Sequence, residues 1–257
     1  MQHCQSNTRR ARRWPPSIIG DLFFGALILL ILTAMTWPWW STPPWGAAVA
    51  VLAYLTLAGC LLLCVPAGWR QLGWANRVTL GRGVLIALLT GSLADSELMT
   101  HHAAALALLA LVALALDGVD GWLARRTATQ SDFGARFDME LDAFFILVLC
   151  LALVVLGKAG PWVLAIGTMR YAFLMAGLRL TWLNAPLPSS YRRKAICVWQ
   201  VVALILALLP MADTTVTAWL AGSALAGLIG SFSIDVRWLY RHASARQPEE
   251  CRLGSPS

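Results

Sequence analysis

Charged residues are scarce in this 257-residue chain. They make up 13% of it, whereas soluble domains usually carry about 25%. Hydrophobic residues make up 58%. This balance excludes a disordered chain and an ordinary soluble domain, and it indicates a protein of the lipid bilayer. Because a spanning helix takes about 20 residues, the chain has room for one membrane domain of about eight spans.

Histidine and cysteine form no group typical of a metal or redox site. The four histidines lie at termini or in loops, and we assign them no chemistry. Most of the six cysteines lie in apolar runs, and nothing completes a metal set around Cys60 and Cys64. No repeat of solenoid length is present. The basic residues form no patch interleaved with stacking aromatics, which argues against nucleic acid as a partner.

Apolar runs separated by proline and glycine predict an all-α integral membrane protein with eight spans. Arginine and lysine gather at alternate ends of these runs, as is typical of cytoplasmic loops. We therefore expect both termini in the cytoplasm, with membrane lipids as partners of the basic side. The expected segments are a basic N-terminus over 1–17, two uncleaved spans over 18–66 and a disordered cytoplasmic tail over 241–257.

Four of the nine aspartates stand at helical spacings near the middle of the chain. One group steps by three, one and three residues, and the next steps by four, so each lies on one face of a helix. The groups are Asp117, Asp120, Gly121 and Ala124, and then Gly134, Asp138 and Asp142. Helices joined by a short loop are antiparallel neighbours, so we expect the four carboxylates to converge at the cytoplasmic edge of the membrane.

Carboxylates at this depth need cations. An aspartate at the centre of a spanning helix costs about 2.5 to 3.5 kcal/mol, and four together would repel one another. Oxygen ligands favour Mg²⁺, Mn²⁺ or Ca²⁺, and four acidic ligands suffice for two such ions. Arg125 offers a forked donor suited to phosphate oxygens. The alternative is a structural polar cluster closed by pairs of arginine and aspartate.

Together these residues form the pattern D-x2-D-G-x2-A-R-x8-G-x3-D-x3-D. This pattern resembles the signature of the CDP-alcohol phosphotransferase (CDP-alcohol phosphatidyltransferase) family. The resemblance covers about residues 70–240. It implies a six-helix family core, here 67–240, preceded by two extra N-terminal transmembrane helices. It also implies that two Mg²⁺ or Mn²⁺ ions are bound by Asp117, Asp120, Asp138 and Asp142, with Asp142 also the general base. The implied nucleotide-binding residues are Gly121, Ala124, Arg125 and Gly134.

A second match, N-x2-T-x2-R, lies one predicted helix earlier at Asn76, Thr79 and Arg82. It resembles the element of the family that helps to form the nucleotide pocket, and the alternative is a polar helix start with an arginine at the membrane edge. The resemblance further suggests acceptor-binding roles for basic residues, against structural pairing or membrane anchoring as alternatives. These residues are Arg170, Arg192, Arg193 and Lys194.

Two features depart from many family members. Ala143 follows the fourth aspartate, where many phosphatidylglycerophosphate synthases have a lysine, and the usual proline after the third aspartate is absent. Glu140 is two residues from both Asp138 and Asp142, so it points to another helix face. We interpret Glu140 as an interhelical group and not as a metal ligand.

The resemblance implies an enzyme of phospholipid biosynthesis, a transferase that moves the phosphatidyl group of CDP-diacylglycerol to a small alcohol and releases CMP. Glycerol 3-phosphate is the favoured acceptor, because the basic residues would bind its phosphate. An inositol phosphate, another alcohol, or the chemistry of a CDP-choline or CDP-ethanolamine transferase are alternatives. A cation-binding membrane transporter is the alternative from a different class. We expect the inner (cytoplasmic) membrane of a bacterium, with the active site at its cytoplasmic edge, and a homodimer is compatible with this arrangement.

Overall fold

The computed structural model describes residues 15–40, 44–65, 69, 71–126, 131–180 and 190–253, without the side chains of 37–40, 44, 124–125, 132 and 242–253. Over these residues the chain forms helices and no strand, which confirms the all-α prediction. The helices are α1 (Pro16–Trp40), α2 (Pro44–Cys64), α3 (Gly73–Ser92), α4 (Ser96–His101), α5 (Ala103–Arg126), α6 (Asp132–Val155), α7 (Leu164–Arg179), α8 (Tyr191–Leu208) and α9 (Thr214–Leu253), with a short 3-10 helix η1 (Pro161–Val163) before α7.

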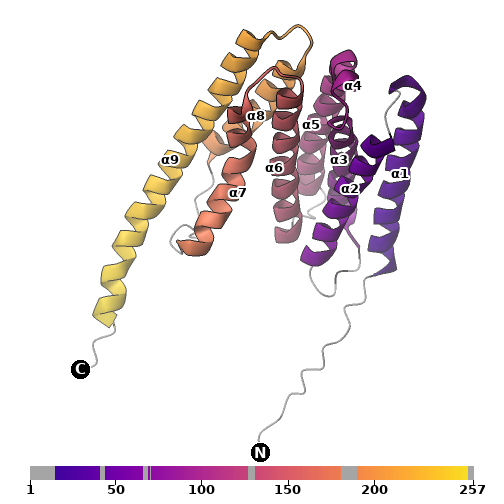
Figure 1. Ribbon diagram of the computed structural model, residues 1–257. Helices are drawn as coiled ribbons and strands as arrows, with labels where there is room; N and C mark the ends of the chain where they lie inside the picture. The colour runs from indigo at the N-terminus through magenta and orange to yellow at the C-terminus, as the bar shows by residue number, and fades with distance from the viewer. Residues whose placement is uncertain are drawn as a thin grey trace, which may run out of the picture.

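The longer helices lie side by side as a bundle (Figure 1). α1 begins and α9 ends at the same end of this bundle, the lower end in Figure 1. Five helices in the described part are long and apolar enough to cross a membrane, over Pro16–Thr36, Trp45–Cys64, Ala103–Leu123, Pro161–Arg179 and Thr214–Arg241. These apolar helices support the prediction of an integral membrane protein.

The other three long helices, α3, α6 and α8, carry their charged residues in their first halves. Their second halves are apolar and contribute many of the buried side chains of the main core. This core joins α3, α5, α6, α8 and α9. The charge that makes these three helices less apolar is therefore gathered at one end of the bundle.

The two N-terminal helices pack against α3. Val84 and Leu88 of α3 belong to an apolar cluster with α1 and α2, whereas Ile86 and Leu89 belong to the main core. Tyr54 of α2 donates a hydrogen bond of 2.7 Å to the carbonyl of Leu22 in α1. Arg77 and Asp21 form an ion pair of 3.1 Å between α3 and α1. α3 is thus held on one side by the N-terminal helices and on the other by the core.

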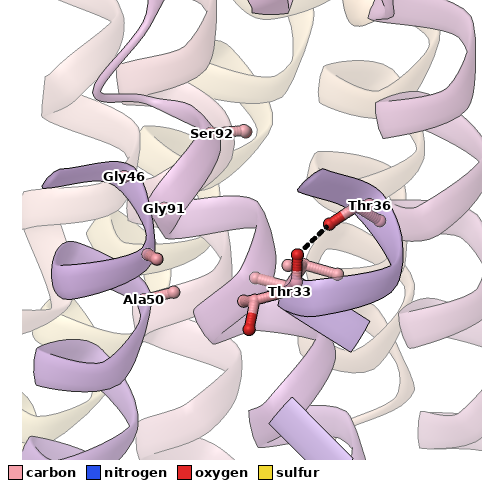
Figure 2. A pocket seen from close by; sticks show the side chains of 8 residues that line it. Thr33, Thr36, Gly46, Ala50, Gly91 and Ser92 are labelled. Carbon is pink, nitrogen blue, oxygen red and sulfur yellow. Dashed lines mark hydrogen bonds between the residues drawn. The ribbon is translucent and has the colours of Figure 1, made fainter. Parts of the chain in front are cut away.

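Small residues bring α2 and α3 close together. A Cβ atom built on Gly91 would lie 2.6 Å from the carbonyl oxygen of Gly46 and 2.8 Å from the Cβ of Ala50. Figure 2 shows these residues beside a cavity that Thr33 and Thr36 of α1 also line. At position 91 a side chain therefore has no room unless the two helices separate.

We expect Gly91→Ala to destabilise the protein by about 1 to 3 kcal/mol, the usual cost of overpacking. The matched control is Gly222→Ala on α9, where a Cβ would meet no atom within 4 Å. Alanine is the better helix former, so the control should be neutral or slightly stabilising. Thermal unfolding in detergent measures both variants, and equal stability of the two would contradict the close packing of α2 and α3.

Lys158 caps the end of α8. Its ammonium donates hydrogen bonds to the carbonyls of Ala207 (3.2 Å), Leu208 (3.4 Å) and Leu209 (2.5 Å). The last carbonyls of a helix lack partners within the helix, and a cation also suits the negative end of the helix dipole. Lys158 follows α6 at the end of the bundle opposite to the charged halves, so this cap gives the lysine a structural role there.

The last helix differs from the sequence prediction. The backbone of α9 is helical as far as Leu253, whereas the composition of 241–257 predicts a disordered tail. Once a helix is nucleated and packed, each further residue adds a hydrogen bond, so a polar extension can continue the helix. Residues 1–14 and 254–257, the outer parts of the two predicted polar ends, lie outside the described residues.

Candidate active site

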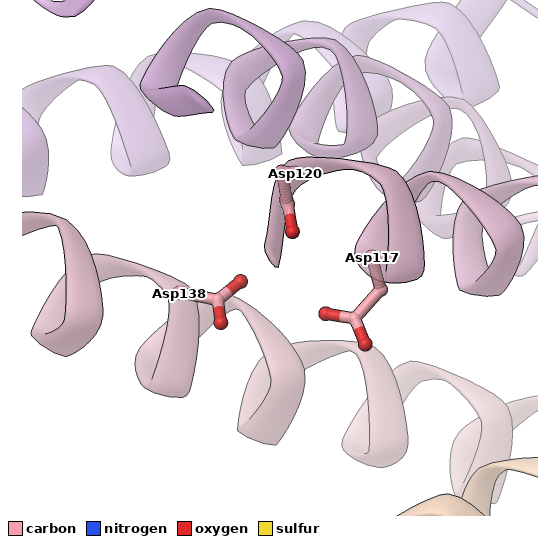
Figure 3. A group of neighbouring side chains, drawn as sticks. All are labelled: Asp117, Asp120 and Asp138. Carbon is pink, nitrogen blue, oxygen red and sulfur yellow. The ribbon is translucent and has the colours of Figure 1, made fainter. Parts of the chain in front are cut away.

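Aspartates from α5 and α6 point toward one another between the two helices (Figure 3). Asp117 and Asp120 of α5 and Asp138 of α6 each offer a carboxylate oxygen, and these oxygens all lie within 4.8 Å of one another. Asp142, one turn further along α6, lines a cavity together with Asp117. The structure therefore brings together the four carboxylates that the spacing predicts.

Arg82 of α3 lies at the centre of this carboxylate cluster. Its Nη1 atom is 2.6 Å from Asp117 Oδ1, 3.2 Å from Asp120 Oδ2 and 2.8 Å from Asp138 Oδ1. Its Nη2 atom donates a hydrogen bond to Asp142 Oδ1. The arginine side chain is only 1% exposed, so α3 supplies a buried counter-ion to acids on two other helices.

These contacts were not predicted from the sequence. The sequence analysis assigns Arg82 to the nucleotide pocket, whereas in the structure the guanidinium of Arg82 is directed at the aspartates. A signal was present, since an arginine inside a membrane helix needs an acidic partner or a cavity. The spacing within one helix could not identify that partner, because the contacts join residues at least 35 positions apart.

The donor set of the carboxylate cluster suits hard divalent cations. Four carboxylates share one guanidinium, so the described side chains of the cluster carry a formal net charge of −3. All ligand atoms are oxygens, which is the preference of Mg²⁺ and Mn²⁺. Asp117, Asp138 and Asp142 have partly exposed side chains, so the cluster can be reached from outside. These residues fit the metal ions that the sequence predicts.

Thr79 supports the carboxylate cluster from α3, and Asn76 lies one turn earlier on the same helix. Thr79 donates a hydrogen bond of 3.0 Å to Asp120 Oδ2, and both residues are buried. The Asn76 amide donates a hydrogen bond of 2.6 Å to the carbonyl of Leu72. A Cβ atom on Gly134 would lie 2.6 Å from Asn76 Oδ1, so the glycine lets the first turn of α6 lie against α3.

The remaining predicted nucleotide residues lie on the second half of α5. Gly121 is half-buried and follows the buried Asp120 directly. The side chains of Ala124 and Arg125 lie outside the described residues, so their predicted contacts with the nucleotide stay predictions.

α8 closes one side of the carboxylate cluster. Cys197, Val198 and Val201 line the same cavity as Asp117 and Asp142. The sequence assigns no role to these residues, because an apolar run carries no mark of the face that meets the site. Their contribution is a mostly apolar wall beside the carboxylates.

Three of the four predicted acceptor residues form ion pairs, in two separate groups. Arg170 of α7 donates a hydrogen bond of 2.5 Å to Glu140 of α6, which confirms Glu140 as an interhelical group. Arg192 of α8 donates a hydrogen bond of 2.5 Å to Asp235 of α9. Arg193 lies 3.6 Å from the same carboxylate. Lys194, the fourth predicted residue, is exposed.

Asp235 is a functional candidate that the sequence analysis missed. It is 9% exposed and lies on α9 between apolar residues. A carboxylate in such a run of a membrane helix normally has a partner, which was the available signal. Its partners lie about 40 residues earlier on α8, so only the fold reveals them.

The comparisons with known proteins agree with this geometry. A family model described as CDP-alcohol phosphatidyltransferase matches residues 72–229. No solved structure matches the chain. The matched segment is more than half of the chain and includes Arg82 and all four aspartates of the carboxylate cluster, while α1 and α2 precede it. The resemblance carried by the aspartate signature is thus confirmed, and the chain belongs to the CDP-alcohol phosphatidyltransferase family.

Proposed function

We propose that this protein transfers the phosphatidyl group of CDP-diacylglycerol to the hydroxyl of a small alcohol and releases CMP. The family consists of transferases of phospholipid synthesis that use a divalent metal, and the apolar helices suggest an integral membrane protein. The observation that carries the proposal is the convergence of four carboxylates inside the matched segment.

In the proposed reaction, the acceptor oxygen attacks the phosphorus that bears the diacylglycerol group. The bond from this phosphorus to the oxygen of the CMP phosphate breaks, and CMP leaves with that oxygen. Asp142 takes the proton of the attacking hydroxyl, as a general base must lie within reach of it. Most of the rate should come from holding the reactants in line and from charge stabilisation.

Asp117, Asp120, Asp138 and Asp142 would hold two Mg²⁺ or Mn²⁺ ions. When bound, such ions supply positive charge to the diphosphate and to the leaving phosphate oxygen. Arg82 keeps the four acids converged, and Thr79 orients Asp120 through its hydroxyl. The protein's own part in the chemistry is therefore to fix the ligands and to receive the proton.

We place the donor nucleotide over the ends of α3, α5 and α6, at Asn76, Thr79, Gly121, Ala124, Arg125 and Gly134. Arg82, which is buried, would act through the aspartates that it pairs with. Asn76 and Thr79 are buried, which supports a role in shaping the α3 side of the nucleotide site. We place the acceptor near Arg170 and the first turn of α8. The sequence favours glycerol 3-phosphate, and an inositol phosphate or an unphosphorylated alcohol has to be compared with it directly.

The decisive experiment measures CMP release from labelled CDP-diacylglycerol by the purified protein with a panel of alcohols. We expect release to stop in chelator and to return with Mg²⁺ or Mn²⁺. Asp138→Asn should abolish metal-dependent nucleotide binding, because it removes a charged ligand from the carboxylate cluster. Full activity in chelator would contradict the role of the metal, and absence of release with every alcohol would contradict the transfer itself.

We also propose that all eight longer helices cross the membrane, with both termini and the carboxylate cluster at the cytoplasmic side. The charged first halves of α3, α6 and α8, and the basic residues near the end of α9, support this orientation. Reporter fusions before Pro16 and after residue 253 should both report the cytoplasm. Opposite locations of the two fusions would contradict an even number of crossings.

A further inference from the structure

Three of the four basic residues that would bind a phosphorylated acceptor are already paired with carboxylates, and the fourth, Lys194, is exposed. Arg170 donates to Glu140 Oε1 at 2.5 Å, from α7 to α6. The two side chains are 32% and 50% exposed, so this ion pair can be reached from outside. A phosphate that approached Arg170 would meet the charge of Glu140 at the same place.

The second basic group is satisfied inside the protein as well. Arg192 donates from Nη2 to Asp235 at 2.5 Å and from Nη1 to the carbonyl of Ser231 at 3.0 Å. Arg193 lies 3.6 Å from the same Asp235 carboxylate. The Asp235 side chain is 13% exposed, so these contacts join α8 to α9 and leave less of the arginine charge for a ligand.

The Glu140–Arg170 pair lies on a different face of α6 from the carboxylate cluster. Glu140 stands between Asp138 and Asp142 in the chain, but its side chain contacts Arg170 of α7. Cys197 of α8 lines the cavity with Asp142, and α6 packs against both α7 and α8. Because we place the acceptor near Arg170, the groups of the alcohol that extend from Asp142 toward α7 would meet this pair.

A carboxylate next to the guanidinium favours uncharged polar ligands over anions. Hydroxyls can donate to Glu140 and accept from Arg170 without breaking the ion pair. A phosphate would have to displace Glu140 or sit beside it, and like charges at close range repel. Ala143, next to Asp142, adds no positive charge that would compensate. The pair thus discriminates against a phosphorylated acceptor by repulsion.

We infer that the acceptor is a hydroxylated alcohol without a phosphate group and that Glu140 determines this specificity. The inference rests on the proposed phosphatidyl transfer. It departs from the preference for glycerol 3-phosphate, because that preference counts the arginines without the carboxylates that the fold places against them.

The test compares acceptors that differ only in the phosphate: glycerol with glycerol 3-phosphate, and inositol with an inositol phosphate. CMP release is measured at saturating CDP-diacylglycerol and Mg²⁺. We expect at least one unphosphorylated member to support release about tenfold better than its phosphorylated counterpart. Better use of the phosphorylated member in both pairs would overturn the inference and leave phosphatidyl transfer standing. Absence of CMP release with every acceptor would overturn the proposed function, and the inference with it.

Glu140→Gln keeps the shape of the side chain and removes its charge. We expect this variant to improve kcat/KM for the phosphorylated acceptors relative to the unphosphorylated ones by about tenfold. The control is Glu97→Gln on α4, an exposed glutamate outside the site, which should leave the ratio unchanged. A ratio that does not move in Glu140→Gln, while both proteins unfold at the same temperature, would contradict the role of Glu140.

Discussion

Arg82→Gln is expected to lower the stability of the protein by about 3 kcal/mol, because it removes the only cation that the structure shows inside the carboxylate cluster among the described residues. Breaking a buried ion pair on one side costs about 3 to 5 kcal/mol, and the partly exposed aspartates place this case at the lower end. Glutamine can still donate hydrogen bonds, so the loss of stability should come mainly from the removal of the positive charge.

Divalent metal should restore part of this loss. Ions that bind only the folded state raise its stability, and the variant has the greater need of positive charge. The rise in unfolding temperature on adding Mg²⁺ should therefore be larger for Arg82→Gln than for the unmodified protein. Thermal unfolding in detergent, with chelator and with Mg²⁺, measures both quantities.

Arg77→Gln provides a matched control on the same helix. Arg77 pairs with Asp21 at 3.1 Å, but its side chain is 38% exposed. An exposed pair usually contributes up to about 1 kcal/mol, so this variant should unfold close to the unmodified protein. If Arg82→Gln is no less stable than Arg77→Gln and loses only donor binding, Arg82 serves the nucleotide and does not hold the carboxylates together.

The carboxylate cluster could be predicted from the sequence, but the arginine that pairs with it could not. The spacing of the aspartates fixes which residues share a helix face, and a short loop makes α5 and α6 neighbours. The convergence of the four carboxylates could therefore be predicted. The position of Arg82 among them depends on how α3 packs against α5 and α6, and no local pattern encodes that packing.

The ion pairs of the proposed acceptor region could not be predicted from the sequence either. Glu140 could be assigned to a different face of α6 from its position alone, and its partner had to be found in the fold. Asp235 and Arg192 are joined across α8 and α9, 43 residues apart. Charges counted along the chain therefore overestimate the positive charge that these arginines offer to a ligand.

The all-α fold and the apolar N-terminal helices followed from composition, because long apolar runs have few alternatives in a membrane. The end of α9 did not, since a polar sequence can continue a helix that packing has already started. The close approach of α2 and α3 at Gly46 and Gly91 was also hidden, because a glycine in an apolar run does not indicate which helix it faces.

The second large effect is expected at Asp142. This aspartate lies one turn beyond Asp138, lines the cavity beside Cys197, and accepts a hydrogen bond from Arg82 Nη2. Its side chain is 26% exposed, so an acceptor hydroxyl can approach it. Asp142→Asn preserves the shape of the side chain and removes its ability to take a proton. Asp213→Asn, at the start of α9, is a suitable control, because asparagine can keep the hydrogen bond to the Val216 amide.

If Asp142 acts chiefly as the general base, Asp142→Asn should bind CDP-diacylglycerol normally and lose roughly 10² to 10⁴ of its turnover. Additional Mg²⁺ would then bring no recovery, because the missing step is the removal of a proton. If Asp142 acts chiefly as a metal ligand, donor affinity and turnover should fall together, and higher Mg²⁺ should partly restore both. Donor binding and CMP release, each measured over a Mg²⁺ titration, separate the two roles. Turnover close to that of Asp213→Asn would contradict both, and it would place the proton acceptor away from this face of α6.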